Sequence, residues 1–168
     1  MREGAGLLPT LRREKQSLTI LDLGTGSGNI AISLAKNLPS SYQVHIIATD
    51  ISEKALKIAK QNAKLHQVEG RITFIKSNLL CNLGGCTFNP NIIVTNLPYI
   101  PSERIPYLDS SVKDFEPHIA LDGGVDGFEL YRKLFQQIKG KGWLARRSLG
   151  VGGKPKLILG EIDYTHGQ

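Results

Sequence analysis

The chain is poor in cysteine and aromatic residues and has no long apolar run, and each of these scarcities excludes a class of protein. Two cysteines, Cys81 and Cys86, stand among 168 residues, too few for a disulfide framework and without the C-x-x-C spacing of a zinc site. No apolar run approaches membrane-spanning length, and the N-terminus has no apolar stretch of the signal-peptide kind. We therefore expect a cytoplasmic protein with reduced cysteines and no metal site.

A net charge of +6 raises the question of nucleic acid binding. The excess of basic residues comes largely from residues 2–15 and 139–156, and Trp143 is the one aromatic residue among the second group. Proteins that stack single-stranded bases interleave aromatic and basic residues, and this pattern is missing here. We interpret the basic residues as a solvated surface and do not expect nucleic acid to be the direct substrate.

Apolar periodicity and turn residues predict one α/β domain with a parallel sheet, residues 18–168, after a basic lead-in, residues 1–17. Strands that alternate with helices imply right-handed crossovers, and we expect five parallel strands in the order 3-2-1-4-5 with helices on both faces. Residues 101–127 and 139–154 lack periodicity and are predicted to be loops. The predicted strands are Leu18–Leu23, Gln43–Thr49, Arg71–Lys76, Asn91–Thr95 and Lys156–Ile162. The predicted helices are Asn29–Asn37, a Ser52-capped helix through Leu65, and one around Phe128 to Ile138.

A glycine-rich loop, LDLGTGSG, follows the first predicted strand. Gly24, Gly26 and Gly28 alternate along it, whereas a dinucleotide-binding fingerprint requires glycine at the position of Asn29. An NAD-dependent oxidoreductase therefore ranks last. Glycines permit close backbone approach to a ligand, and Asp22 beside them suits the ammonium or sulfonium of S-adenosylmethionine.

More polar side chains follow the other strands, at the edge where ligands bind to parallel sheets. We expect Asp50 to accept hydrogen bonds from ribose hydroxyls and Asn78 to contact an adenine amino group. As alternatives, Asp22 and Asp50 are capping or turn carboxylates and Asn78 is a turn residue. The full set of predicted cofactor-binding residues is Asp22, Gly24, Thr25, Gly26, Gly28, Asp50, Ile51, Asn78, Leu79 and Asn96.

The tetrapeptide Asn96-Leu97-Pro98-Tyr99 comes directly after the fourth predicted strand. An amide nitrogen, or the amine of adenine, is a poor nucleophile because its lone pair is delocalised. The Asn96 side-chain oxygen and the Leu97 carbonyl can accept both N–H groups and so aim that lone pair at a methyl group. Pro98 stiffens the turn, and Tyr99 can stack on the planar group. These four residues are the predicted catalytic residues, for methyl transfer to a planar nitrogen.

At this point the sequence resembles the HemK-type protein-glutamine N5-methyltransferases. The resemblance extends from about Leu18 to Gln168 and implies a Rossmann-like, class I S-adenosylmethionine-dependent methyltransferase fold. It further implies that the substrate is the glutamine of a Gly-Gly-Gln motif in a peptide chain release factor. We also expect the protein to be monomeric. The similar segments are LDLGTGSGNIAISLA (Leu21–Ala35), TNLPYI (Thr95–Ile100), EPHIALDGGVDGFELYRKL (Glu116–Leu134) and GEIDYTHGQ (Gly160–Gln168).

This chain departs from the family pattern at several places. Leu97 replaces the first proline of the motif, and Asn78 stands where an acidic residue is usual. The family's helical N-terminal domain and the elements after the fifth strand have no counterpart here. We therefore expect a core fragment, truncated after strand five.

Two alternatives stay open. An adenine N6 methyltransferase acting on DNA or RNA would share the glycine-rich loop and the Asn96 chemistry, so the segment Glu116–Leu134 decides between the two substrate classes. Alternatively, the fragment binds cofactor without turnover.

Overall fold

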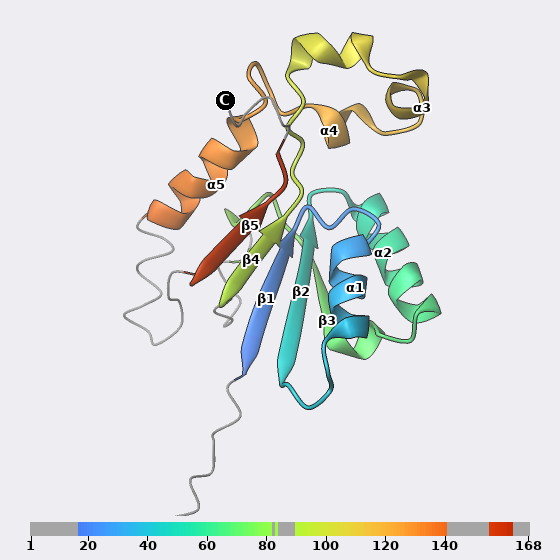
Figure 1. Cartoon of the computed structure of the whole chain (residues 1–168), viewed down its shortest axis with the longest axis vertical. Helices are drawn as coiled ribbons and strands as arrows, with labels where there is room; N and C mark the ends of the chain where they lie inside the picture. Colours follow the sequence, from blue (N-terminus) through green and yellow to red (C-terminus); the bar gives the residue numbers. More distant parts are fainter. Residues whose placement is uncertain (1–16, 82, 84–89, 141–154, 163–168) are drawn as a thin grey trace, which may run out of the picture.

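A five-stranded parallel sheet forms the centre of the computed structural model, which describes residues 17–81, 83, 90–140 and 155–162 (Figure 1). The strand order is β3-β2-β1-β4-β5, and every pairing is parallel. The observed strand order and the parallel direction of the strands confirm the prediction made from the sequence. The predicted lead-in and the stretch beyond Ile162 lie outside the described residues. The strands are β1 (Leu18–Leu23), β2 (Val44–Asp50), β3 (Ile72–Lys76), β4 (Ile92–Thr95) and β5 (Leu157–Gly160).

Three longer helices connect the strands: α1 (Asn29–Asn37), α2 (Glu53–Leu65) and α5 (Glu129–Lys139). Ser52 caps α2 as predicted, because its hydroxyl accepts a hydrogen bond from the Ala55 N–H at 3.2 Å. A 3-10 turn, η1 (Glu69–Arg71), leads into β3. No helix in the described part of the chain combines the length and apolarity needed to cross a membrane.

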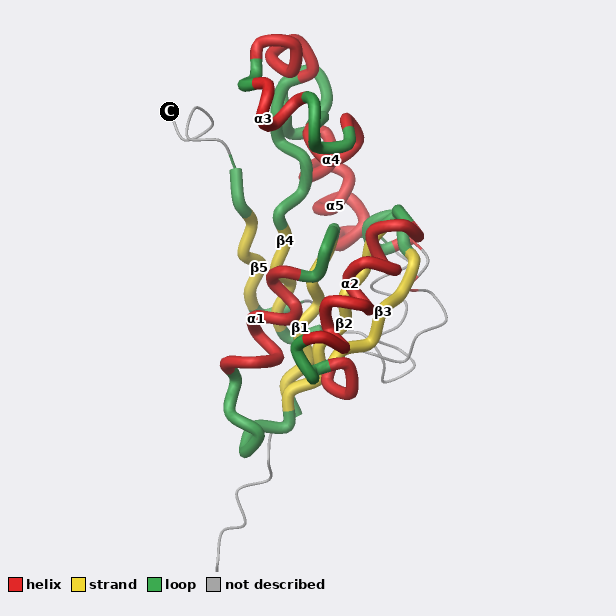
Figure 2. The backbone as a smooth tube through the Cα atoms, turned by 90° about the vertical axis from the view of Figure 1, so that its right-hand side faces the viewer, coloured by secondary structure: helices red, strands yellow, loops and turns green. Residues whose placement is uncertain are grey.

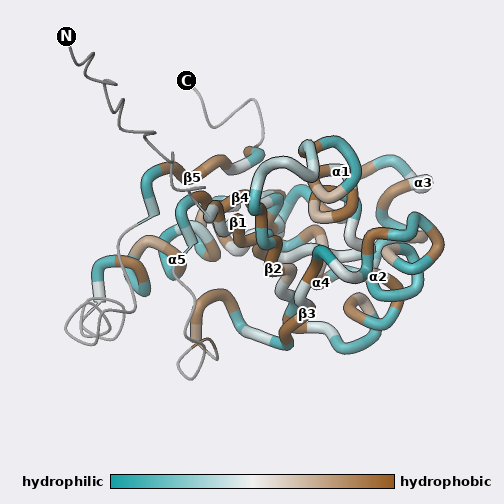
Figure 3. The backbone as a smooth tube through the Cα atoms, turned by 90° about the horizontal axis from the view of Figure 1, so that it is seen from below, coloured by the Kyte–Doolittle hydropathy of each residue, from teal (hydrophilic) through white to brown (hydrophobic). Residues whose placement is uncertain are grey.

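Each face of the sheet has its own apolar core, because side chains alternate between the faces of a strand. Leu21, Leu23 and Ile93 pack on one face with Leu134 and Ile138 of α5. On the other face, the small residues of α1 and the end of α2 pack on Ile46 and Ala48 of β2. In Figure 3 apolar colour concentrates along the central strands. The two cores leave the carboxyl ends of the strands as the edge where loops gather.

A helical cap lies beyond this edge, where a loop without regular structure was predicted. Residues 101–127 contain η3 (Ser102–Tyr107), α3 (Ser110–Lys113) and α4 (His118–Leu121). Figures 1 and 2 show these elements extending past the end of β4. The prediction failed because helices this short carry no apolar periodicity. They depend on local caps, such as the Asp109 carboxylate that accepts from the Ser111 N–H at 2.8 Å.

Candidate functional site

The two predicted motifs meet because β1 and β4 are neighbours in the sheet. Leu23 pairs with Thr95 at the carboxyl ends of these strands, so Gly24 and Asn96 leave the sheet side by side. The buried Thr95 hydroxyl donates to the Leu23 carbonyl at 2.8 Å and fixes this exit. The predicted cofactor loop and the predicted catalytic turn, separated by about seventy residues of sequence, thus become adjacent.

The glycine-rich loop is held by bonds to β2. Thr25 donates its N–H to the Thr49 carbonyl at 2.9 Å, and the Gly26 N–H donates to an Asp50 carboxylate oxygen at 2.9 Å. Gly28 has φ of 91° and lies so close to α2 that a Cβ would come within 3.2 Å of the Ala59 Cβ. At Gly26 a Cβ would meet nothing within 4 Å. The loop is therefore fixed at Gly28 and open at Gly26.

Asp22 is fully buried beneath the loop. Its Oδ2 accepts hydrogen bonds from the Thr25 hydroxyl at 2.7 Å and the Ala31 N–H at 3.1 Å, while its buried Oδ1 has no partner among the described residues. Burial raises the pKa of this carboxyl to about 6; the bonds from Thr25 and Ala31 oppose the rise, and nearby Asp50 adds to it. Oδ2 thus accepts hydrogen bonds from the loop and from the start of α1. Oδ1 remains able to accept a hydrogen bond or to pair with a cation.

Asp50 ends β2 and holds two backbone turns. Besides Gly26, it accepts the Ser52 N–H at 2.8 Å through its other oxygen. Each carboxylate oxygen has a second lone pair, so these bonds leave capacity for ribose hydroxyls. Ile51, the next residue, is 47% exposed and offers an apolar surface to a flat base. Asp22 and Asp50 are therefore turn and capping carboxylates, as the alternative held, and they also retain free acceptor capacity.

Asn78 and Leu79 follow β3 and have different surroundings. The Asn78 side chain is exposed and available to a ligand. The Leu79 side chain is buried in the core on the α5 side, so any contact with a cofactor would run through its backbone. Leu79 has φ of 51°, which is uncommon outside glycine and marks a tightly constrained turn.

In the predicted catalytic turn, Asn96–Tyr99, the Asn96 side chain faces outward and the Leu97 side chain faces inward. Asn96 is exposed, and in the described part of the chain no hydrogen bond involves its side-chain amide. Leu97 is 4% exposed and belongs to the core beneath. Half-buried Tyr99 donates its hydroxyl to Glu161 Oε1 at 3.4 Å. The Asn96 amide is therefore exposed to solvent, on a turn that the buried Leu97 side chain anchors to the core.

The segment from Leu121 to Gly123 packs behind this turn, and we call this segment the wall. Its position was not predicted from the sequence. The Ile100 N–H donates to the Leu121 carbonyl at 3.1 Å, and the Gly123 N–H donates to the Ile100 carbonyl at 2.9 Å. A Cβ at Gly123 would lie 2.7 Å from the Tyr99 Cα. The signal available in the sequence was the family-like segment Glu116–Leu134, which contains both Leu121 and Gly123.

The Asp122 carboxylate joins this wall to η3. It accepts from the Ser102 hydroxyl at 2.7 Å and from the Gly124 N–H at 2.9 Å. The bonds from Ser102 and Gly124, with a smaller contribution from His118, lower the pKa of this carboxyl. Asp122 is therefore an ionised acceptor at neutral pH, and it anchors the start of the cap.

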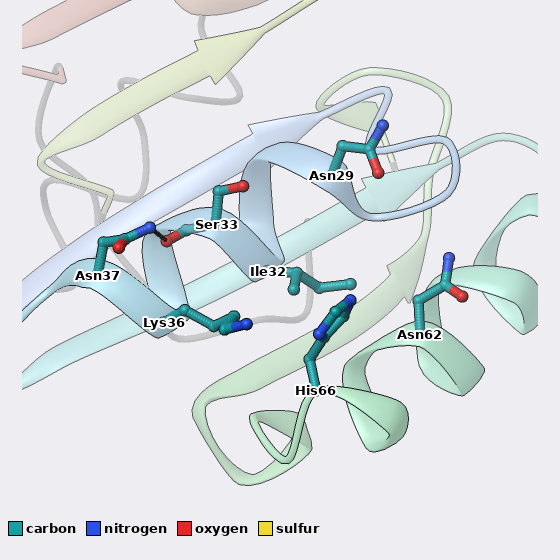
Figure 4. A pocket seen from close by; sticks show the side chains of 7 residues that line it. All are labelled: Asn29, Ile32, Ser33, Lys36, Asn37, Asn62 and His66. Carbon is teal, nitrogen blue, oxygen red and sulfur yellow. Dashed lines mark hydrogen bonds between the residues drawn. The ribbon is translucent and has the colours of Figure 1, made fainter.

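A separate groove of about 460 Å³ lies between α1 and the end of α2 (Figure 4). Its lining is mostly polar and includes Lys36, Asn62 and His66. None of the sequence-predicted site residues lines it. The predicted site is instead the edge of the sheet formed by the glycine-rich loop and the turn at Asn96.

The residues at that edge fit S-adenosylmethionine. The unpartnered Asp22 Oδ1 suits an ammonium group, and Asp50 retains acceptor capacity for ribose hydroxyls. The open face of Gly26 allows close approach, and Ile51 offers apolar contact for adenine.

Sequence comparisons point to the same chemistry. Residues 14–87 match a family described as a methyltransferase domain. Over 159 residues the chain is 36% identical to a release factor glutamine methyltransferase of Geobacter sulfurreducens, covering 92% of this chain and 53% of that protein. Over 123 residues it is 44% identical to a release factor glutamine methyltransferase of Dictyoglomus turgidum, covering 73% and 42%. This chain thus spans about half the length of the curated relatives that it matches.

Among solved structures, a ribosomal protein L11 methylase from Lactobacillus delbrueckii subsp. bulgaricus is 33% identical to this chain. The match covers 61% of this chain and 50% of that one, with a TM-score of 0.40, too low to bear on the site. The methyltransferase-domain match and the strand order together confirm the predicted Rossmann-like, class I fold and the predicted cofactor, S-adenosylmethionine.

Proposed function

The chain is a relative of the release factor glutamine methyltransferases over most of its length, as its sequence predicted, and from that relationship we propose that it methylates a glutamine side-chain amide in a release factor. The glutamine is that of a Gly-Gly-Gln motif, and the compartment is the cytoplasm. Residues 18–168 form the methyltransferase domain in this proposal, and the protein acts as a monomer. The single observation that carries the proposal is the exposed amide of Asn96, set directly beside the glycine-rich loop.

Asn96 and Leu97 orient the substrate nitrogen. The Asn96 side-chain oxygen accepts one N–H of the glutamine amide and the Leu97 carbonyl accepts the other, so the nitrogen lone pair points toward the glycine-rich loop. Pro98 restricts the backbone that carries this carbonyl, and the Tyr99 ring stacks on the planar amide. Holding reactants in this way contributes several kcal/mol to lowering a barrier.

Asp22, Asp50 and Ile51 hold the cofactor in this proposal. When bound, S-adenosylmethionine supplies a methyl group that is transferred to the amide nitrogen as its bond to sulfur breaks. Asp22 Oδ1 pairs with the cationic amino group of the cofactor, and the Asp50 carboxylate accepts hydrogen bonds from the ribose hydroxyls. Ile51 and Asn78 contact the adenine. No residue of the chain needs to remove a proton first, because the nitrogen loses its proton to water once it is methylated.

The experiment is methylation of a release-factor domain that contains the Gly-Gly-Gln motif, with S-adenosylmethionine, followed by peptide mass spectrometry. The expected result is a gain of one methyl group on that glutamine. A substrate domain with glutamine replaced by alanine is the control. Methylation of an adenine-containing oligonucleotide instead would favour the nucleic-acid alternative, and cofactor binding without methylation of either would favour a binding fragment.

A further inference from the structure

Glu161 lies directly after β5 and is not among the site residues that the sequence predicted. Thr95 of β4 pairs with Gly160 of β5 at the end of the sheet, and the Glu161 N–H donates to the Thr95 carbonyl at 3.1 Å. Asn96 follows the same register pair on β4, so Asn96 and Glu161 leave the sheet side by side. Glu161 therefore extends the edge that the glycine-rich loop and the turn at Asn96 form.

Tyr131 holds the backbone of Glu161 from the α5 side of the sheet. This tyrosine is 5% exposed, and its hydroxyl donates a hydrogen bond to the Glu161 carbonyl. A Cβ at Gly160 would lie 2.9 Å from the Tyr131 Cε1, so glycine at this point of β5 lets the ring approach the strand. Burial raises the pKa of Tyr131, so its hydroxyl keeps its proton and remains a donor at neutral pH. The Glu161 backbone is thus bonded on both sides, to β4 and to α5.

The Glu161 side chain reaches the aromatic ring of the proposed catalytic turn. The residue is exposed, and its Oε1 accepts a hydrogen bond from the Tyr99 hydroxyl at 3.4 Å. This bond is long, but hydrogen bonds in catalytic sites commonly shorten once the substrate is bound. Because the backbone of Glu161 is held at two points, its carboxylate offers the tyrosine hydroxyl an acceptor at a fixed place.

Two further contacts locate Tyr99. The Tyr99 side chain packs in part against the core that includes Leu97. A Cβ at Gly123 would lie 2.7 Å from the Tyr99 Cα, so the wall confines the backbone of this residue. The wall thus fixes where the side chain begins, the core supports part of it, and Glu161 holds its hydroxyl end. Together these contacts define the plane of the ring.

We infer that Glu161 is a positioning residue that holds the Tyr99 ring in the plane needed to stack on the substrate amide. This inference rests on the proposed function, in which that ring stacks on the glutamine amide while Asn96 accepts one of its N–H groups. A flat amide makes full contact only with a ring that lies parallel to it. Glu161 acts through Tyr99 and touches neither the reacting nitrogen nor the cofactor.

The test begins with two substitutions of Glu161. Glu161→Ala removes the acceptor, and we expect kcat for glutamine methylation to fall about tenfold with the cofactor Kd unchanged. Glu161→Gln keeps an acceptor oxygen at the same reach, so its kcat should stay within about twofold of the wild type. The matched control is Glu69→Ala, at an exposed glutamate in η1, which leads into the opposite edge strand of the sheet.

Three results would overturn the inference. One is a wild-type kcat in Glu161→Ala. Another is a lowered melting temperature of Glu161→Ala with unchanged kcat, which would make Glu161 a structural residue only. The third is an equal loss of kcat in Glu161→Ala and Glu161→Gln, which would assign the effect to the charge of the carboxylate and not to the bond.

A double-mutant cycle tests whether the bond to Tyr99 carries the effect. Tyr99→Phe keeps the ring and removes only the hydroxyl, so it breaks the same bond from the other side. We expect a similar loss of kcat, about tenfold, and no further loss when Glu161→Ala is added. Additive losses in the double variant would show that Glu161 acts through another contact, and would overturn the inference.

Nuclear magnetic resonance of Tyr99 provides a measurement that does not depend on activity. In protein isotopically labelled at the tyrosine Cζ carbon, Tyr99→Phe identifies the Tyr99 signal by its loss. We expect this signal to move in Glu161→Ala and to stay in place in Glu69→Ala. An active wild type whose Tyr99 signal is the same in Glu161→Ala would defeat the inference alone. A signal that moves while the wild type methylates no glutamine would defeat the proposed function, and the positioning role with it, and leave only the contact established.

Discussion

The Leu97 side chain packs against the backbone of Gly24, where a Cβ would lie 3.3 Å from Leu97 Cδ2. This contact joins the proposed catalytic turn to the glycine-rich loop through apolar atoms. The Asn96 carbonyl oxygen lies near the same point, 3.9 Å from that Cβ position. A side chain at Gly24 would therefore push the two halves of the proposed site apart.

Asn96→Ala should separate catalysis from cofactor binding. It removes one of the two acceptors for the substrate amide, and we expect glutamine methylation to fall by roughly 100-fold or more. The cofactor Kd should change little, because the glycine-rich loop keeps its bonds to β2. Single-turnover methylation and calorimetry on the same samples provide the measurement, with Asn37→Ala on α1 as the control. Normal methylation by Asn96→Ala would show that the proposed amide-to-amide mechanism is wrong.

Asp50→Ala should weaken cofactor binding. The change removes the proposed ribose acceptor and the bond that holds the Gly26 N–H. A charge-assisted hydrogen bond contributes about 1.5–3 kcal/mol, so we expect the Kd for S-adenosylmethionine to rise roughly 10- to 100-fold. Glu53→Ala is the matched control, because that exposed carboxylate pairs with Lys76 on the surface. Equal affinities of the two variants in calorimetry would leave Asp50 a turn residue only.

Cofactor affinity should depend on pH through Asp22. Its pKa is raised from 3.8 to about 6, so the folded protein holds the proton more tightly than the unfolded chain. The stability of the unliganded protein should therefore fall as pH rises through about 4 to 6. A bound cation favours the ionised carboxylate, so affinity should rise with pH by up to tenfold per unit below about 6 and level off above it.

Asp22→Asn tests this assignment. The amide does not ionise, so the dependence of cofactor affinity on pH should disappear in this variant. At pH above about 6 the unliganded variant should melt at a higher temperature than the wild type, because no buried charge remains. Calorimetric titration and thermal denaturation across this pH range provide the measurements. A pH profile that persists in Asp22→Asn would assign the titration to another group.

Gly123→Ala should disturb the wall behind Tyr99. The added Cβ would lie 2.7 Å from both the Tyr99 Cα and the Gly127 carbonyl oxygen, so backbone must move. Overpacking of this kind costs about 1–3 kcal/mol, and we expect lower melting temperature together with lower turnover. Gly70→Ala serves as the control, since a Cβ there meets nothing within 4 Å. If Gly123→Ala had the melting temperature of the wild type, the backbone around Tyr99 would be shown to accommodate the added methyl group without cost.

Local signals explain why much of the fold could be predicted from the sequence. The bounds of β1 and α1 match the prediction, because an apolar run ends at the glycine-rich loop and Pro39 follows the helix. Ser52 marked the start of α2 in the same way. Ile58 is an exception, because helical spacing predicts that it lies on the apolar side of α2 and its side chain is 48% exposed. A helix with this many small residues offers several orientations, and tertiary packing selects one.

The remaining features depend on contacts between residues far apart in the chain. The turns of the cap are held by Asp122 and Ile100, which reach across it, so no short window of sequence contains the signal. The helical spacing of Tyr131, Leu134 and Ile138 predicts that Tyr131 lies on the buried side of α5, and its ring does lie in the core. Its hydroxyl donates to the Glu161 carbonyl just beyond β5, and only the folded chain brings these two residues together.

The position of β1 between β2 and β4 has a consequence for the order of folding. The cofactor side of the molecule is built from neighbours in sequence, since β1, β2 and β3 pair consecutively. Asn96 arrives with β4, whose pairing with β1 closes a loop of about 72 residues. Closure over such a distance is slow compared with local pairing. The glycine-rich loop is therefore expected to take shape early, and Asn96 to reach it late, so variants that weaken β4 should delay catalytic competence more than the binding of S-adenosylmethionine.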